Sequence, residues 1–544
     1  MTSARDDALR LHDQGRYAEA QAVLEAWLRE SPDAPEAQRG WRRLQLLQAR
    51  VETPPDVAGR VALARTLAAL QGPAAAQGAD EGARLQRAVE LILPVLGDIP
   101  EADRGAIARL LWRVGQYEAA ESLGGLVERG RYSASNADPQ GLLPLFSRAE
   151  THADRLELLS QHRLWARGIE QAAAARPVVR PPRQPRDRLR LGFLSSDLRH
   201  HVVAYFAQPV FEFPDPRFEL YAYSSFPGPA DVVQPWFEGQ TKAFRKLPPD
   251  DHIAAQMIAD DDLDMLVDLG GPTGHSRPAL LAYRPARVQT SWLGYPHSLG
   301  LSAIDHIVAD PLVAPTDASL LLEAPLMMPG SWVCMAPAAF GPQPAPSPAP
   351  PSVANGYITF GTANDPYKFS PRVLGTWARV LAATPGSRFM IVRPEAGAPA
   401  FQQAVAGRFR QAGVAADRLI FRPLRGAVRP AYADIDIALD TFPVTGGTTT
   451  CDALWMGVPT VTLAGEAMFE RLSLSLLTSA DLGDLAAWSE DEFVRIAVDL
   501  AADATRLADL RQSLRLRIRL SPLGQPARFA ADFYDLMAGA IAAA

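Results

Sequence analysis

The segment DTFPVTGGTTTCDALWMGVP (residues 440–459) joins a short apolar run of strand type to an apolar helical run. The strand-like run is IDIALDT (435–441), and Gly457 and Pro459 end the helix soon after it begins. The Gly-Gly-Thr-Thr-Thr turn between them places unpaired backbone N–H groups at a helix start, under very little side-chain bulk. Such a turn can bind an anion. It can also be an ordinary strand-to-helix turn capped by threonine, so the rest of the chain has to decide.

Strand-like and helical runs alternate on both sides of this segment. The other strand-like runs in the C-terminal half are YITFGTA (357–363), RFMIVRP (388–394), LIFRPL (419–424) and TVTLAG (460–465). The N-terminal set opens with RLRLGFLSSDLRHH and continues with FELYAYSS (218–225), DMLVDLGG (264–271), QTSWLG (289–294) and DHIVAD (305–310). This alternation is typical of parallel α/β domains. We therefore predict two Rossmann-like halves that face a cleft, with ligands beyond the carboxyl ends of the strands.

The first ~150 residues read as packed helices with a degenerate repeat. The residues that carry the spacing of a tetratricopeptide helix pair are Gly15, Tyr17, Ala20, Leu28 and Pro32. Ala88 follows Ala20 by twice the 34-residue period of that repeat, and Gly115, Tyr117 and Ala120 repeat the pattern. Pro54 and Pro55 stand where a further repeat is expected. A plain helical bundle with coincidental spacing is the alternative.

Pro-rich segments divide the chain. The predicted parts are a helical repeat domain (1–171), a Pro/Arg-rich connector (172–187), a first Rossmann-like half (188–335), a Pro-rich linker (336–356) and a second Rossmann-like half with C-terminal helices (357–544). A chain of 544 residues is too long for one core, which agrees with several domains.

Composition excludes several classes of protein. A net charge of −7 and a pI near 5.8 argue against general nucleic-acid binding. The two cysteines, Cys334 and Cys451, allow neither a disulfide framework nor a Cys-rich zinc site. The sequence shows no secretory signal and no apolar stretch long enough to span a bilayer, so we expect a soluble cytoplasmic protein.

Polar loops follow several strands on the same side of the predicted sheets. They are SSDLRHH (195–201), GGPTGHSR (270–277), TANDPYK (362–368) and TFPVTGGTTT (441–450). In the second half, Lys368 follows the first strand and the Gly/Thr helix start follows a later one. A lysine charge and a helix N-terminus are two standard ways to hold a diphosphate.

Five motifs occur in the order of a known family. They are LLSQHRLWARGIE, LRLGFLSSDLRHHVV, LVDLGGPTGHSRPALLAYRPARVQTSWLGYPHSLG, TANDPYKFSPRVLGTWARVLAATPGSRFMIVR and LDTFPVTGGTTTCDALWMGVPTVTLAGE. From about residue 158 to its C-terminus, the chain resembles the O-GlcNAc transferases of glycosyltransferase family 41, especially bacterial members with tetratricopeptide repeats.

The resemblance implies an inverting, metal-independent transferase of GT-B type. It would move a sugar, GlcNAc by analogy, from a UDP-sugar to a Ser or Thr hydroxyl of a protein. The first half would take the acceptor and the second half the nucleotide sugar, with no cofactor besides this co-substrate. The helical repeats would present a groove to the acceptor protein.

The resemblance also implies roles for residues of the second half. Lys368 would contact the diphosphate, and Thr448 and Thr449 would offer the helix start to the outer phosphate. Asp452 would take the ribose hydroxyls. The nucleotide-sugar residues predicted in full are Lys368, Gly446, Gly447, Thr448, Thr449, Thr450 and Asp452. A lysine and helix N–H groups can stabilise the charge on departing UDP without a metal.

The first half supplies the candidates for acid–base chemistry, because all nine histidines lie at or before His306. His201 matches the family's histidine near the reaction centre and could accept or relay a proton, or orient the acceptor and sugar. The alternative is an ordinary polar loop that Asp197 fixes. The candidates for the sugar and acceptor pocket are Asp197, His275, Arg277, Tyr295 and His297.

Several positions depart from the family pattern. Pro272 replaces a histidine, His297 replaces a glycine, and Val444-Thr445 replaces Tyr-Asn. His275 and His297 are either replacements for the lost histidine or structural. Two further functions therefore stay open: a transferase dedicated to a flagellin or an adhesin, with another sugar or an Asn acceptor, and a catalytically weak repeat scaffold.

Overall fold

The structure is a computed structural model that describes residues 16–30, 53–69, 78–123, 146–335, 344–424 and 427–544, together with Asp7 and Leu11. The chain divides into two compact units. Unit 1 comprises Met1–Val127, Arg393–Gly407 and Phe421–Ala427. Unit 2 comprises Glu128–Val392, Arg408–Ile420 and Val428–Ala544. We describe each unit by itself.

Unit 1 is helical in its N-terminal part. Its helices are α2 (Tyr17–Glu30), α4 (Val57–Ala69), α5 (Gly78–Ile92), η1 (Leu93–Asp98), α6 (Glu101–Arg113) and α7 (Tyr117–Ser122). Three alanines of the predicted repeat, Ala20, Ala88 and Ala120, are buried, as expected of small residues at helix contacts. Gly15 and Pro32, and the side chains of Tyr17 and Leu28, lie outside the described residues. The assignment to the tetratricopeptide class stays a prediction.

Helix α5 of unit 1 packs closely on η6 (Pro394–Gly397), which belongs to the same unit. A Cβ atom on Gly82 would lie 2.6 Å from the backbone of Gly397, so this contact needs glycine. Arg113 Nε donates to Glu395 Oε1 at 2.6 Å, and the Glu395 side chain is fully buried. Residues 393–407 are therefore an integral part of the helical unit, although sequence patterns assign them to the second half.

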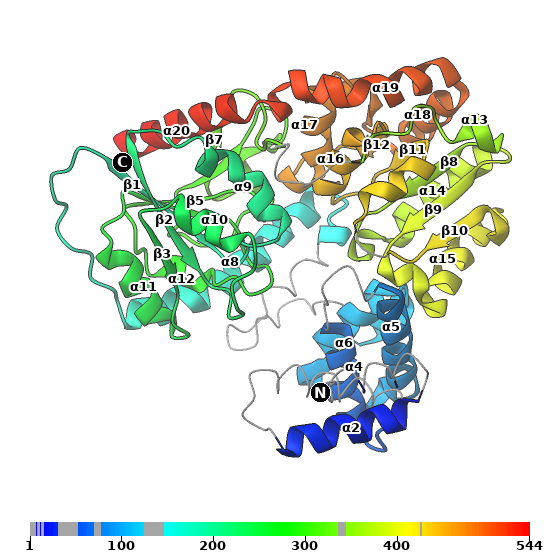
Figure 1. Cartoon of the computed structure of the whole chain (residues 1–544), viewed down its shortest axis with the longest axis horizontal. Helices are drawn as coiled ribbons and strands as arrows, with labels where there is room; N and C mark the ends of the chain where they lie inside the picture. The colour runs from blue at the N-terminus through cyan, green and yellow to red at the C-terminus, as the bar shows by residue number, and fades with distance from the viewer. Residues whose placement is uncertain are drawn as a thin grey trace. The chain divides into compact units, whose positions relative to one another are not determined.

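The first sheet of unit 2 has seven parallel strands in the order β3-β2-β1-β4-β5-β6-β7 (Figure 1). The strands are β1 (Leu189–Ser195), β2 (Phe218–Ser224), β3 (Ala243–Lys246), β4 (Met265–Asp268), β5 (Val288–Ser291), β6 (His306–Ala309) and β7 (Ala324–Met327). Sequence patterns find five of these and miss β3 and β7. Both are short edge strands, and neither is a buried apolar run.

Helices cover the first sheet and connect its strands. They are α8 (His152–Ala175), α9 (Val202–Glu212), α10 (Gln234–Gly239), α11 (Asp251–Asp260), α12 (Ala279–Ala282) and η3 (Ala318–Leu320). Helix α8 runs beyond the predicted end of the repeat domain at residue 171 and belongs to unit 2. Helix α8 contacts both halves of unit 2. His162 Nε2 lies 2.5 Å from Tyr295 Oη of the first half, and Arg155 forms a buried ion pair with Glu470 of the second half at 2.6 Å.

The second sheet has six strands in the order β10-β9-β8-β11-β12-β13. They are β8 (Thr359–Thr362), β9 (Arg388–Val392), β10 (Leu419–Arg422), β11 (Ile437–Leu439), β12 (Thr460–Leu463) and β13 (Ala486–Ala487). The pairings of β8 with β9 and β11, and of β12 with β11 and β13, are parallel. Two parallel sheets in an α/β arrangement confirm the predicted fold class.

The connecting segments of this second half are helical. They are α13 (Ser352–Asn355), η5 (Pro366–Lys368), α14 (Pro371–Ala383), α15 (Pro399–Gln411), η7 (Ala416–Arg418), η8 (Arg429–Asp434), α16 (Thr448–Trp455), η9 (Met468–Glu470), α17 (Leu472–Ser479), η10 (Gly483–Leu485), α18 (Glu490–Ala502), α19 (Ala504–Leu520), η11 (Pro522–Gly524) and α20 (Pro526–Ala543). Within the described ranges, no helix combines the length and the apolar character that a membrane crossing requires.

The C-terminal helix α20 packs on the first half, not on the half that precedes it in sequence (Figure 1). Tyr534 Oη donates to the Val210 carbonyl at 2.6 Å, and the Phe533 ring lies 4.6 Å from that of Trp292. Phe529, Phe533 and Tyr534 belong to the apolar core of the first sheet. The chain therefore crosses between the two halves a second time at its C-terminus.

Candidate functional site

The loops after β8 and β11 meet because these two strands are neighbours in the second sheet. Strand β8 leads into η5, which ends with Lys368, and β11 leads into the Gly/Thr turn before α16. The carboxyl ends of parallel strands lie at one edge of a sheet. Sheet order thus brings together two motifs that lie about 80 residues apart in sequence.

Asp440 is the centre of this meeting point and is 1% exposed. Its carboxylate accepts hydrogen bonds from the backbone N–H groups of Thr441 and Gly446, the Asn364 amide, and the Thr462 and Ser473 hydroxyls, at 2.6–3.1 Å. Burial raises the pKa of Asp440, and Ser473 and the Lys368 charge oppose this rise. One buried carboxylate therefore fixes the loop after β8, the Gly/Thr turn and the start of α17.

Lys368 points into the same network. Its ammonium donates to the Thr445 carbonyl at 2.9 Å and lies 3.5 Å from Asn364 Oδ1, which also accepts from the Thr449 hydroxyl at 2.9 Å. The ammonium is thereby held beside the first turn of α16. A positive charge and a helix N-terminus at one place form a strong anion site.

Gly446 and Gly447 serve different purposes in the turn. A Cβ on Gly446 would lie 2.4 Å from Thr450 Oγ1 and 2.8 Å from Thr449 Oγ1, so packing requires glycine there. A Cβ on Gly447 would meet no other atom within 4 Å. Gly447 is the N-cap of α16, and no side chain caps this helix start. The N–H groups of the first turn are therefore left uncovered by side chains at the point where Gly447 offers space.

Asp452 lies one turn into α16 and is 5% exposed. Arg429, the first residue of η8, donates from Nε to Asp452 Oδ1 at 2.7 Å. Burial raises the pKa of Asp452, and the charge of Arg429 opposes this. Tyr432, also in η8, donates from its hydroxyl to the Thr449 carbonyl at 3.1 Å. Helix η8 thus holds both the start of α16 and the predicted ribose-binding carboxylate.

His201 begins helix α9 in the first half. Its Nδ1 accepts from the Val203 N–H at 3.3 Å and lies 3.6 Å from the buried carboxylate of Asp197. Burial lowers the pKa of His201, whereas Asp197 raises it. With Nδ1 as an acceptor, the neutral ring carries its proton on Nε2.

Asp268 is a second acid–base candidate, at the carboxyl end of β4. It is 2% exposed, lies opposite Leu194 of β1, and accepts from the Gly271 N–H at 2.8 Å. Burial raises the pKa of Asp268 to about 6, so its proton exchanges near neutral pH. The sequence offered a signal that was not used: a carboxylate at the end of an apolar strand.

Two of the pocket candidates lie inside an aromatic cluster. Tyr295 and His297 are 2% and 1% exposed and pack with Phe146, His162 and Phe469. Neither ring nitrogen of His297 has a hydrogen-bond partner among the described residues. Burial lowers the pKa of His297 well below its usual value and that of His162 to about 4.

The structure separates the other two pocket candidates from this cluster. Arg277 donates to Asp251 at 2.6 Å and to the Pro248 carbonyl at 2.5 Å. His275 is exposed, with its ring against Phe226 and a left-handed backbone of φ 61°. Asp197 is the pocket candidate for which a contact with His201 is found among the described residues.

Helices α9 and α16 begin in the two different halves, and one residue of α9 responds to a charge from the other half. Burial raises the pKa of Tyr205, which lies one turn after His201, and the positive charge of Arg429 opposes that rise. The charge of Arg429, which pairs with Asp452, therefore acts on a residue of α9.

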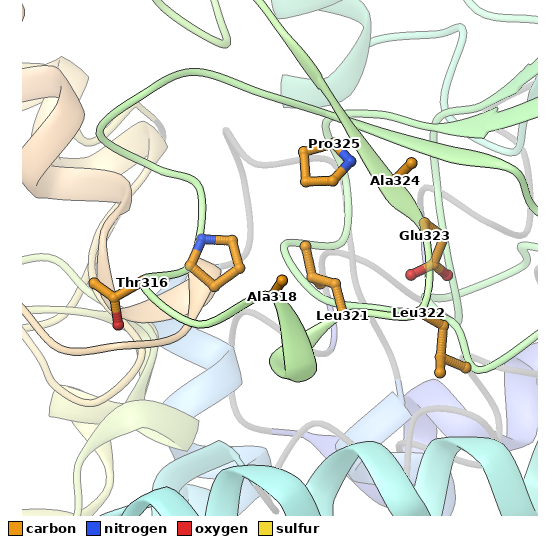
Figure 2. A pocket seen from close by; sticks show the side chains of 8 residues that line it. Thr316, Ala318, Leu321, Leu322, Glu323, Ala324 and Pro325 are labelled. Atoms are coloured by element: carbon orange, nitrogen blue, oxygen red, sulfur yellow. The ribbon is translucent and has the colours of Figure 1, made fainter.

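A cavity of about 480 Å³ lies elsewhere in the first half, between the turn after β6 and strand β7 (Figure 2). Its lining is Pro315, Thr316, Ala318, Leu321, Leu322, Glu323, Ala324 and Pro325, none of which is a predicted site residue. Among the described residues, no group of three or more His, Cys, Asp and Glu side chains is arranged to hold a metal ion.

Sequence reasoning missed the residues that support the site: Asn364, Asp440, Thr445, Ser473 and Arg429. Asp440 is the first residue of the segment 440–459, but the sequence does not predict its hydrogen-bond partners, because they depend on the order of strands in the sheet. Lys368 had a further signal, because only three of the 54 basic residues are lysines. Because nearly all basic residues of this chain are arginines, a lysine at this position is a distinctive signal.

Comparison with known proteins agrees with this geometry. The model of the family "Glycosyl transferase family 41" matches residues 173–331 and 351–533, more than half of the chain. The Arabidopsis thaliana protein named "Probable UDP-N-acetylglucosamine--peptide N-acetylglucosaminyltransferase SPINDLY" is 35% identical over 364 residues, which cover 65% of this chain and 39% of that protein. The Petunia hybrida protein of the same name is 34% identical over 64% of this chain and 38% of its own length. The chain thus spans well under half the length of these relatives.

A solved structure covers the chain almost completely. It is a mutant of the O-GlcNAc transferase of Thermobaculum terrenum, with a TM-score of 0.73 and 28% identity. The match covers 97% of this chain and 95% of that one. The helical N-terminal part and both sheets therefore occur together in a known protein.

Proposed function

The chain belongs to glycosyl transferase family 41, and from this premise we propose that it transfers a sugar from a UDP-sugar to a serine or threonine hydroxyl of a protein. The names of its relatives support N-acetylglucosamine as the sugar. Because the chain spans 39% of the length of the first of these relatives, its own activity is inferred from its site.

One observation carries the proposal: the Lys368 ammonium lies beside the uncapped start of α16, where Gly447 leaves space. When the sugar departs from UDP, negative charge grows on the diphosphate. Lys368 and the N–H groups of the first turn would stabilise this charge from fixed positions, which lowers the barrier most when no reorganisation is needed. In this proposal the protein supplies the charge that a metal ion supplies in other transferases.

The acceptor hydroxyl would approach from the first half, opposite the departing diphosphate, so that the anomeric carbon inverts. His201 would orient the sugar or the acceptor by donating from Nε2, since Nδ1 accepts from the Val203 N–H. Asp268, with a pKa of about 6, is the carboxylate of the first half best suited to take up the proton through a relay. The helices of unit 1 would bind the acceptor protein, as stacked helix pairs do.

Thermal stabilisation by nucleotides tests the proposal. The ligands are UDP, UDP-GlcNAc, UDP-glucose, UDP-galactose, GDP-mannose and a CMP-sugar, each near saturation. Binding at 100 times Kd stabilises the native state by about 2.7 kcal/mol, which raises the melting temperature measurably. We expect UDP compounds to stabilise the wild-type protein and not the Lys368→Ala variant.

Lys246→Ala is the matched control, because Lys246 is an exposed lysine that donates only to the Gly228 carbonyl at 3.0 Å. It should respond to UDP like the wild type. Stabilisation by the GDP or CMP compound alone would show that the donor is not a UDP-sugar. A well-folded protein that responds to none of these ligands would refute the transferase and favour a repeat scaffold.

A further inference from the structure

The pairing of Arg429 with Asp452 is a feature that the family resemblance did not lead us to expect. The two side chains are 11% and 8% exposed and are joined at 2.7 Å. Within the described part of the chain, Arg429 is the group that hydrogen-bonds to this carboxylate. A buried ion pair contributes little net stability, because desolvation of both charges offsets their attraction. We therefore looked for a role of this ion pair other than stabilising the fold.

The position of Arg429 suggests that role. It begins η8, whose Tyr432 hydroxyl donates to the Thr449 carbonyl in the first turn of α16. One helix thus holds the diphosphate end of the site through Tyr432 and the nucleoside end through Arg429. The charge of Arg429 also acts on Tyr205 of α9, a residue of the first half.

Arg429 binds one side of the Asp452 carboxylate. Its Nε donates to Oδ1, and among the described residues no hydrogen bond to Oδ2 is found. A carboxylate that is held at one oxygen presents the other in a fixed direction, with its negative charge preserved. This is the arrangement that an acceptor of hydroxyl hydrogen bonds needs.

We propose that Arg429 is a positioning residue for the donor nucleoside, which holds the Asp452 carboxylate so that its second oxygen accepts from a ribose hydroxyl. This inference rests on the proposed function, since it needs a ribonucleotide at the start of α16. Arg429 itself touches neither the sugar nor the diphosphate in this role. Its removal should weaken nucleotide binding and leave the chemical step unchanged.

The test is calorimetric titration of UDP and 2′-deoxy- and 3′-deoxy-UDP into the wild type and the variants Arg429→Ala, Arg429→Lys and Arg515→Ala. Arg515 is the matched control. It donates to the Trp455 carbonyl at the end of α16, the helix that carries Asp452, and has no hydrogen bond to Asp452. Loss of one charged hydrogen bond corresponds to about a 10- to 100-fold increase in Kd for UDP with Arg429→Ala. Arg429→Lys should recover part of the affinity, and Arg515→Ala should bind as the wild type does.

Two readouts separate positioning from a merely structural role. First, the wild type should prefer UDP over a deoxy analogue, and Arg429→Ala should lose this preference. Second, Kd of Arg429→Ala should rise more steeply than that of the wild type as pH falls from 8 to 6. Burial raises the pKa of Asp452, and without the Arg429 charge the carboxylate protonates at higher pH. The other charged or titratable groups that act at this place are Tyr205, Arg515 and Cys451.

The outcomes are distinguishable. A wild type that binds none of the three nucleotides refutes the proposed function itself. A wild type that binds UDP, with Arg429→Ala and Arg429→Lys equal to it in affinity, deoxy preference and pH profile, overturns the role of Arg429. If Arg429→Ala fails to fold, Arg429→Lys decides through the same two readouts.

Discussion

The two halves place polar loops at the same edge of their sheets but use them in opposite ways. In the second half, the side chains of Asn364, Thr462 and Ser473 converge on Asp440, and Lys368 and the start of α16 lie around it. In the first half, most of the polar residues that sequence patterns single out are engaged elsewhere. Arg277 donates to residues 248–251, and Tyr295 and His297 are buried among aromatic rings.

Under the proposed function, this difference predicts where substrate specificity resides. The second half is organised before any substrate binds, since one buried carboxylate already fixes its loops. Preorganised charges of this kind are the main source of electrostatic catalysis. In the first half, Asp197 lies beside His201 after β1 and Asp268 ends the neighbouring strand β4, so the proposed acceptor site rests on few residues. We expect donor binding to be strict and acceptor selection to depend on the surrounding surface.

Replacing Asp440 by alanine should have the largest effect. It removes the acceptor of five hydrogen bonds and leaves buried donors unsatisfied, at a cost of about 3 kcal/mol or more. Calorimetry should show a melting temperature lower by several degrees, and UDP should no longer stabilise the protein. Thr462→Val is the control, because it removes a single donor to Asp440, at about 1 kcal/mol. Equal effects of the two variants would show that Asp440 is not the centre of the network.

The two glycines of the turn offer a sharper comparison within the second half. Gly446→Ala places a Cβ 2.4 Å from Thr450 Oγ1, and such overpacking costs about 1–3 kcal/mol. Gly447→Ala meets no atom within 4 Å and keeps a negative φ of −106°, but its ψ of −85° lies outside the helical region, so the melting temperature should fall, by less than for Gly446→Ala. Its methyl group should also raise Kd for UDP in calorimetric titration. Wild-type affinity of Gly447→Ala would mean that no ligand occupies the space above this residue.

The fold was largely predictable because its strands are short apolar runs with sharp ends. LRLGFLS and FELYAYS in the first half, and FMIV and IDIAL in the second, form strands where the pattern places them. The edge strands β3 and β7 were missed: β3 carries two basic residues among four, and β7 is a short apolar run that contains a proline and is largely exposed. The return of α20 to the first half was missed too, because an apolar helix face does not say which sheet it covers.

The sequence predicted only those parts of the candidate site that the backbone forms, namely turns and helix starts. Gly446 to Thr450 form the predicted helix start, with Lys368 beside it, since sequence reads turns and strand ends directly. The functions of these residues stay predictions. The sequence did not predict the roles of Asp440 and Arg429, because the order of the strands decides which side chains bond to the same carboxylate. Arg277 shows a contact that the sequence did not predict: its guanidinium donates to Pro248 and Asp251, and its role in a pocket stays a prediction.

His297 tests whether the first half tolerates the loss of its buried polar groups. His297→Phe keeps an aromatic ring in the cluster and removes two unsatisfied nitrogens, so we expect a gain of about 1 kcal/mol at pH 7. The folded pKa of His297 lies below 6.5, so the unfolded chain binds its proton first and stability falls as pH drops below 6.5. The variant should lose part of this acid sensitivity in melting curves between pH 7 and 5. His162, whose pKa is about 4, and His201, whose pKa is also lowered, should contribute to the remainder. A less stable variant with reduced transfer would instead give His297 a role in the site.

His275 should show the smallest effect, and it tests whether the first half hides a second pocket histidine. Its ring is exposed beside Phe226, and its carbonyl accepts from the Ser225 hydroxyl at 2.9 Å. Asparagine adopts the left-handed backbone found here more readily than most residues, so His275→Asn should keep the loop and change stability by less than about 0.5 kcal/mol. UDP affinity and peptide transfer should both equal those of the wild type. A tenfold loss of transfer with unchanged UDP affinity would place His275 on the acceptor, and the first half would then bind its substrate through an exposed loop.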